Sequence, residues 1–130
     1  MKNLKILSFL LVIMVFFHSC LAIDDIERKQ TVRVQLKNNT SNTINLWVEG
    51  ESMGASNLVE PQGIRESVII ITFHVTADEY ANPARFSINA GYNGEPLQST
   101  ICSIDYEPSY NKLERIYPAQ FNSDGSFSGF

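Results

Sequence analysis

Beyond residue 20, two side chains are the obvious candidates for nucleophilic chemistry: the one histidine, His74, and the one cysteine, Cys102. A nucleophilic triad needs a hydroxyl or thiol, a base, and a group that orients the base. The apolar alternation around Cys102 places it on the same strand face as Ile104, where a small thiol is a common core residue. No Gly-x-Ser-x-Gly turn supplies a serine nucleophile instead. We therefore expect Cys102 to be a core residue and not the partner of His74.

Three residues near the end of the chain resemble metal ligands in their spacing. Asn122, Asp124 and Ser126 present oxygen atoms at alternate positions, as the ligands of a calcium loop do. No bidentate acid follows at the proper distance, and an Asp-Gly hairpin turn accounts for the same residues. One histidine and one cysteine cannot form a zinc site unless distant loops contribute carboxylates. We expect no metal and no other cofactor, since phosphate-binding and dinucleotide-binding motifs are also absent from the sequence.

Two acidic pairs have the residue types of a glycosidase site, namely Asp78 with Glu79 and Asp105 with Glu107. Solvent exposure alone explains these residues equally well, because charged side chains are common at the loop ends of an acidic domain. The sequence therefore favours a protein without catalytic activity.

The aromatic residues suggest binding chemistry. Alternation places Trp47 on the strand face opposite Ile44, Leu46 and Val48. If Trp47 is exposed, it can form a platform for sugar rings or an anchor for a protein partner, together with tyrosines from neighbouring loops. The alternative is that Trp47 packs under a loop or under the N-terminal segment. The predicted recognition surface consists of Trp47, Tyr80, Tyr92 and Tyr110, with Tyr106 as a further candidate.

These residues must be positioned by β-strands, because apolar and polar residues alternate in several separate segments. The run at 68–71 is instead continuously apolar, which predicts a central strand covered on both faces. Asn93 with Gly94 and Asp124 with Gly125 are hairpin signals. The predicted strands are residues 32–37, 44–49, 58–59, 68–75, 85–92, 97–106, 115–121 and 126–130, and the first two are expected to form a hairpin.

Seven or eight short strands in residues 31–130 are typical of an immunoglobulin-like β-sandwich or a small barrel. We expect an all-β domain, a single immunoglobulin-like antiparallel β-sandwich. The resemblance is to the architecture alone, because the disulfide and buried tryptophan of antibody domains are missing. Sandwiches serve many unrelated functions, so the fold does not identify a ligand.

The beginning of the chain has the layout of a secretory signal peptide. Lys2 and Lys5 precede an apolar run over residues 6–17, which polar residues follow. The run is shorter than the roughly 20 residues that a transmembrane helix needs. We therefore expect residues 1–19 to be removed on export.

The end of this signal, Ser19 followed by Cys20, resembles the lipobox of bacterial lipoproteins. The resemblance implies that Cys20 carries a lipid, that residues 20–30 form a tether, and that the protein is anchored to a membrane of the cell envelope. An alternative cut after Ala22 predicts a soluble secreted protein instead. The lipobox resemblance covers the first 20 residues only and implies nothing about the activity of the domain.

Charge narrows the class of partner. Losing Lys2 and Lys5 with the signal changes the formal net charge from −4 to −6, so binding to nucleic acid is not expected. We predict a non-enzymatic binding or structural module of the cell envelope, with a protein or glycan ligand. The alternatives are a soluble secreted carbohydrate-binding or protein-inhibitor module, and a eukaryotic secreted domain, for which the sequons beginning at Asn38 and Asn39 are the signal.

Overall fold

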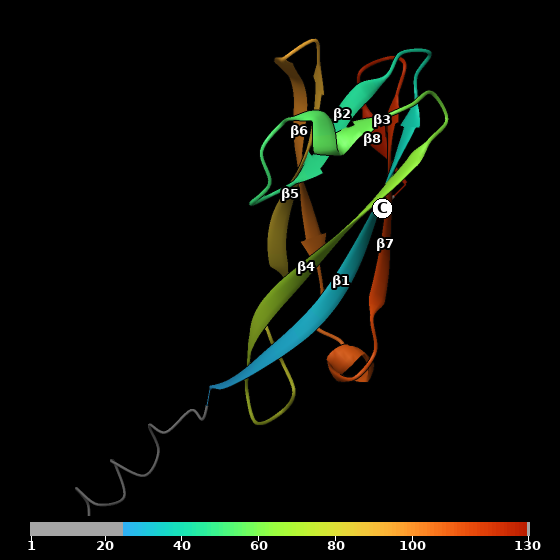
Figure 1. The fold of residues 1–130 in the computed structure, drawn as a ribbon. Coiled ribbons are helices and arrows are strands. Elements are labelled where there is room, and N and C mark those ends of the chain that lie inside the picture. The colour runs from blue at the N-terminus through green and yellow to red at the C-terminus, as the bar shows by residue number, and fades with distance from the viewer. Residues whose placement is uncertain (1–24, 130) are drawn as a thin grey trace, which may run out of the picture.

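The computed structural model describes residues 25–129, which form two four-stranded β-sheets packed face to face (Figure 1). One sheet has the strand order β4-β1-β7-β8 and the other β3-β2-β5-β6. This arrangement confirms the predicted all-β fold and its sandwich form. The elements are β1 (Ile26–Asn39), β2 (Ile44–Val48), the 3-10 helix η1 (Ala55–Asn57), β3 (Leu58–Val59), β4 (Ile64–Val75), β5 (Ala84–Tyr92), β6 (Glu95–Ile104), the 3-10 helix η2 (Pro108–Asn111), β7 (Arg115–Asn122) and β8 (Phe127–Ser128).

The core lies between the sheets and follows the predicted alternation. In β1, Val32, Val34 and Leu36 point inward and are buried, while the residues between them are half-exposed. Cys102 and Ile104 share the inward face of β6, as predicted. The predicted hairpins β5–β6 and β7–β8 are both present. No helix among residues 25–129 has the length and apolar character needed to cross a membrane.

The predicted hairpin of the first two strands is wrong, because β1 and β2 belong to different sheets. β1 pairs with β4 on one side, antiparallel, and with β7 on the other, in parallel, so neither of its edges is free for β2. The parallel β1–β7 pair also departs from the purely antiparallel arrangement that we expected.

The chain crosses between the sheets at a corner held by the buried side chain of Asn38. Its Nδ2 donates to the carbonyl oxygens of Asn42 at 2.7 Å and Val59 at 2.9 Å, and its Oδ1 accepts the Thr40 amide at 2.9 Å. Full burial of Asn38 also removes it as an acceptor for a glycan, contrary to the expectation of an exposed turn. At Asn39, the side-chain amide donates to Gln120 Oε1 at 3.0 Å.

The prediction of a central strand at 68–71 is also wrong. β4 is an edge strand, with β1 as its neighbour in the sheet. Ile71 and Phe73 point into the core, whereas Val68 is 56% exposed and Ile70 is 69% exposed. The continuous apolar run therefore covers one buried face and one face that is open to solvent.

The first strand begins at Ile26, so residues 26–30 are part of the sheet and not of a tether. Their side chains are exposed up to Lys29, which explains why the sequence lacks a sustained apolar pattern here. Their backbones pair with β4 in the register Ile26 with Val75 through Gln30 with Ile71. The predicted signal at residues 1–19 and the lipidation site Cys20 lie outside the described residues.

A carboxylate connects β4 to the opposite sheet. Glu51, in the loop after β2, accepts hydrogen bonds from Arg65 at 2.8 and 3.0 Å and from Ser67 at 2.6 Å. It also accepts the Val48 amide at 3.1 Å. Partial burial acts to raise the pKa of Glu51, but the hydrogen bonds from Arg65, Ser67 and Val48 outweigh it and lower this pKa to about 2.

Candidate functional site

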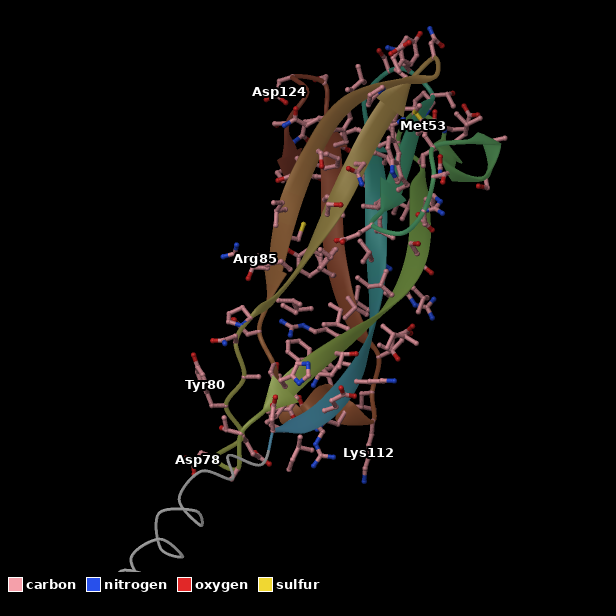
Figure 2. The ribbon with its side chains drawn as sticks, turned by 90° about the vertical axis from the view of Figure 1, so that its left-hand side faces the viewer. Met53, Asp78, Tyr80, Arg85, Lys112 and Asp124 are labelled. Atoms are coloured by element: carbon pink, nitrogen blue, oxygen red, sulfur yellow. The ribbon has the colours of Figure 1, made fainter. Side chains whose placement is uncertain are left out.

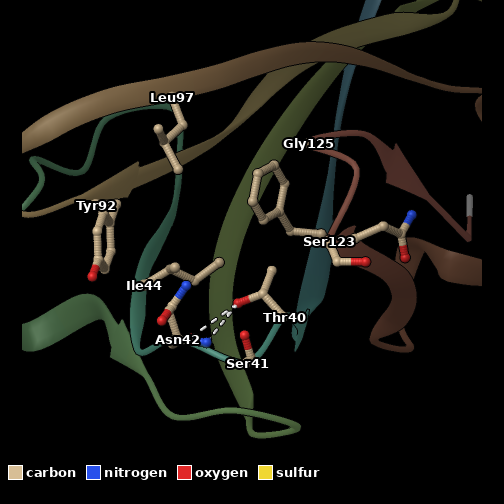
Figure 3. A pocket seen from close by; sticks show the side chains of 10 residues that line it. Thr40, Ser41, Asn42, Ile44, Tyr92, Leu97, Ser123 and Gly125 are labelled. Atoms are coloured by element: carbon tan, nitrogen blue, oxygen red, sulfur yellow. Dashed lines mark hydrogen bonds between the residues drawn. The ribbon is translucent and has the colours of Figure 1, made fainter.

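The loops that leave β1, β5 and β7 meet at one end of the sandwich and line an open pocket of about 210 Å³ (Figure 3). We call it the loop-end pocket. Figure 3 shows Tyr92, Leu97 and Ile44 on one side of the pocket and Ser123 on the other. Its lining residues are Thr40, Ser41, Asn42, Ile44, Tyr92, Leu97, Phe121, Asn122, Ser123 and Gly125.

The first wall of the loop-end pocket is the corner between β1 and β2. Thr40 is half-buried and its hydroxyl donates to Asn38 Oδ1 at 2.8 Å, whereas Asn42 is exposed. The backbone N–H of Asn42 donates to Thr40 Oγ1 at 3.2 Å, and this hydrogen bond closes the turn. Serine, threonine and asparagine favour such turns because their side chains bond to nearby backbone groups.

The second wall is the turn between β7 and β8. Asp124 Oδ1 accepts the Ser126 amide at 2.9 Å and the Ser126 hydroxyl at 2.6 Å, and Gly125 has a positive φ of 82°. These hydrogen bonds from Ser126 lower the pKa of the exposed Asp124 carboxyl. The carboxylate is therefore used in the turn, as the hairpin interpretation predicted for these residues. Among residues 25–129, no cluster of His, Cys, Asp and Glu side chains could hold a metal ion.

The chemistry of the loop-end pocket is neutral. None of its lining side chains carries a charge; they offer hydroxyl and amide groups beside the rings of Tyr92 and Phe121. Phe121 is buried, whereas Tyr92 is 38% exposed and available to a ligand. A ring that packs on apolar C–H groups, with hydroxyl and amide groups that hydrogen-bond to polar substituents, suits a ligand that is apolar on one face and rich in hydroxyls at its edge.

Tyr92 is the one predicted recognition residue that lines the loop-end pocket. Trp47 lies on the outer face of β2, half-buried, in register with Asn89 of β5. Gly91 leaves room for it there, because a side chain at position 91 would collide with Met53 Sδ and with the Trp47 ring. Trp47 is thus half-buried beside Gly91, and Met53 of the β2–β3 loop lies next to the same position.

The other two predicted aromatic residues lie at the opposite end of the sandwich. Tyr80 is 64% exposed in the β4–β5 loop, and Figure 2 shows it at the end remote from Asp124. Tyr110 lies in η2, where the Arg115 guanidinium stands 5.2 Å from the centre of its ring. The structure therefore does not bring Trp47, Tyr80, Tyr92 and Tyr110 together into one platform.

His74 and Cys102 do not form a pair. His74 is on the outward face of β4, with its Nδ1 3.1 Å from Asp25 Oδ2. Cys102 is buried in the other sheet, and burial raises the pKa of its thiol, an effect that a hydrogen bond with Tyr117 partly opposes. Of the acidic residues considered above, Asp78 and Glu79 lie in the exposed loop between β4 and β5.

Most polar residues that line the loop-end pocket, such as Ser41, Asn42 and Ser123, carry no sequence signal of a binding site. The clusters around Asn42 and Ser123 were predicted to be turns, but these turns are about 80 positions apart in the chain. The parallel register of β1 with β7, in which Asn39 faces Asn122, brings them together. No family model, no curated protein and no solved structure matches this chain.

Proposed function

We propose that this chain is an exported, non-enzymatic binding module whose loop-end pocket recognises a neutral, hydroxyl-rich ligand, a glycan. The observation that carries the proposal is the uncharged lining of the pocket, which combines the exposed ring of Tyr92 with hydroxyl and amide side chains. Carbohydrate rings present C–H groups on their faces and hydroxyls at their edges, which fits this combination. A lining without charge does not favour phosphates or carboxylates, in keeping with the acidic charge of the whole chain.

The position of the pocket supports display from a membrane anchor at Cys20. β1 extends from Ile26 to Asn39, and 14 residues of strand span about 45 Å. The loop-end pocket is lined by residues just after the end of β1, and in the sequence Cys20 lies five residues before the first described residue, Asp25. A lipid on Cys20 would therefore leave the pocket facing away from the membrane of the cell envelope.

The second candidate is a soluble secreted module that binds carbohydrate or inhibits another protein. The neutral pocket suits this candidate equally, so the cleavage site separates the two. Mass spectrometry of the mature N-terminus tests it. An acylated Cys20 supports the lipoprotein, and an unmodified chain that starts at Ile23 overturns the anchor.

Ligand binding is tested with two tyrosine variants. Full-length protein prepared from cells is titrated with a panel of neutral oligosaccharides, and Tyr92→Ala is compared with Tyr80→Ala. We expect Tyr92→Ala to weaken binding at least about tenfold, equivalent to about 1.4 kcal/mol, because it removes the ring from the pocket. Tyr80→Ala should bind as the wild type does, since Tyr80 lies at the other end. Equal losses in both variants, or no binding to any member of the panel, would contradict the proposal.

A further inference from the structure

The edges of the two sheets are not protected equally. β3 and β8 end their sheets with two residues each, and β6 carries Pro96 near its start. β4 is 12 residues long and contains neither proline nor glycine, and its centre, Val68 to Phe73, carries no charge. Natural sheets usually shorten, charge or interrupt their edges, because a long apolar edge strand pairs with other strands.

The free hydrogen-bonding groups of β4 can be assigned from one contact at its start. The backbone N–H of Asn38, the residue of β1 opposite Gly63, donates to the Gly63 carbonyl oxygen at 3.0 Å. Since donors and acceptors alternate between the two sides of an antiparallel strand, the odd-numbered residues of β4 bond to β1. The amides and carbonyls of the even-numbered residues, which include Val68 and Ile70, therefore point to the free edge.

The same even-numbered residues carry the exposed side chains. Ile64, Val68 and Ile70 are all more than half exposed on the outer face of the sheet. Backbone groups and apolar side chains are thus offered together, along one continuous stretch of strand. A further β-strand added at this edge would satisfy the backbone groups and cover Val68 and Ile70 at once.

We propose that β4 pairs with β4 of a second copy of this chain, antiparallel about a two-fold axis at Ile70. In this register Ile70 faces Ile70 of the second copy, and Val68 faces Thr72 of the second copy. Glu66 then faces His74 of the second copy, so a carboxylate meets an imidazole at each end of the pair. The edge of β4 is complementary to itself: apolar at the centre, with an acid on one side and a basic group on the other.

The Glu66 carboxylate has capacity for this contact. Its Oε2 accepts from Arg33 at 2.8 Å and its Oε1 accepts from Gln35 at 2.8 Å, which leaves each oxygen with a further lone pair. The pairing joins two four-stranded sheets into one continuous eight-stranded sheet. It does not involve the loop-end pocket, so it stands independently of the proposed function.

Cross-linking in cells tests the pairing with a matched control on the other edge. Cells expressing the full-length chain with Ile70→Cys are treated with a short, membrane-permeant bis-maleimide, and the product is resolved by denaturing electrophoresis. Ile101→Cys is the control, because Ile101 is 71% exposed on β6. The wild-type chain reports any background from Cys20 or the buried Cys102. We expect Ile70→Cys to give several-fold more product at twice the chain mass than Ile101→Cys.

Sedimentation of the purified chain provides a second measurement. Ile70→Lys places two ammonium groups opposite each other at the axis, and we expect it to raise the dissociation constant of the dimer at least about tenfold. Ile101→Lys should leave the constant unchanged, and circular dichroism shows whether each variant is folded. Equal cross-linking at positions 70 and 101, or a monomeric wild type, overturns the proposal. Cross-linking of Ile70→Cys to a different protein overturns it too, since β4 would then pair with another chain.

Discussion

The two long edge strands, β4 and β6, show how differently one sandwich treats its borders. Both bury alternate apolar residues, with Ile71 and Phe73 in β4 and Cys102 and Ile104 in β6. On their outer faces, β6 presents Ile101 between Ser99 and Ser103, whereas β4 presents Val68 and Ile70 side by side. The inner faces therefore serve the fold in the same way, and the outer faces do not.

The two strands also differ in how their first residues are held, residues 64–67 in β4 and residues 95–99 in β6. In β4, Arg65 and Ser67 reach the Glu51 carboxylate of the opposite sheet. In β6, residues 95–99 are exposed and lie beside the loop-end pocket, to which Leu97 contributes. The comparison indicates that β4 is fastened to the opposite sheet near its start, through Arg65 and Ser67, while the outer face of its centre stays open.

The largest expected effect is on stability, and it differs between the inner and the outer face of β4. Phe73→Ala should lower the free energy of unfolding by about 3–5 kcal/mol, because it leaves a cavity in the core beside Tyr106, whose ring centroid is 5.4 Å away. Ile70→Ala should change it by no more than about 0.5 kcal/mol in dilute protein, where no second copy covers this residue. Urea unfolding followed by the fluorescence of Trp47 measures both. An Ile70→Ala cost close to that of Phe73→Ala would show that the outer face of β4 is buried within the single chain.

An intermediate effect concerns the carboxylate that fastens β4. Glu51→Gln should lower the free energy of unfolding by about 1–3 kcal/mol, because Arg65 is left without its charged partner at a half-buried position. Glu95→Gln, at the exposed start of β6, is the matched control and should be neutral. The same urea titration applies. Equal effects of the two variants would contradict the view that β4 and β6 are held differently.

Much of the fold could be predicted because alternation is a local property. Val32, Val34 and Leu36 show their burial within six residues of sequence, and Asn93 with Gly94 identifies the β5–β6 hairpin within two. The position of a strand within its sheet is not local. The run at 68–71 reads as a central strand, but β4 lies at the end of its sheet because it pairs with β1 and with no other described strand.

The candidate site was less predictable for the same reason. Tyr92 could be singled out as an aromatic residue next to a turn. Its neighbours in the pocket could not, because Ser41 and Ser123 resemble the residues of any turn until the parallel β1–β7 register brings their loops together. Trp47 could be singled out by residue type, but its half-buried position beside Gly91 depends on the pairing of β2 with β5.

The smallest expected effect is the pH dependence that Glu51 contributes. The folded-state pKa of Glu51, about 2, lies below the value of about 4.3 for an unfolded glutamate. Its stabilisation is therefore complete above the unfolded pKa and is lost as the pH falls toward 2. Because Glu51→Gln cannot titrate, the difference in stability between wild type and this variant should be constant from pH 7 to about pH 5 and should shrink from about pH 4 downward.

Taking this difference removes the contributions of other carboxylates whose pKa is lowered, such as Glu66 and Asp124, because both proteins contain them. Urea titrations of the two proteins at each pH provide the measurement. If the gap between them stayed constant down to pH 3, Glu51 would titrate alike in the folded and unfolded chain. The contact between Glu51 and β4 would then depend on the shape of the Glu51 side chain and not on its charge. A charged contact with the opposite sheet would no longer distinguish β4 from β6.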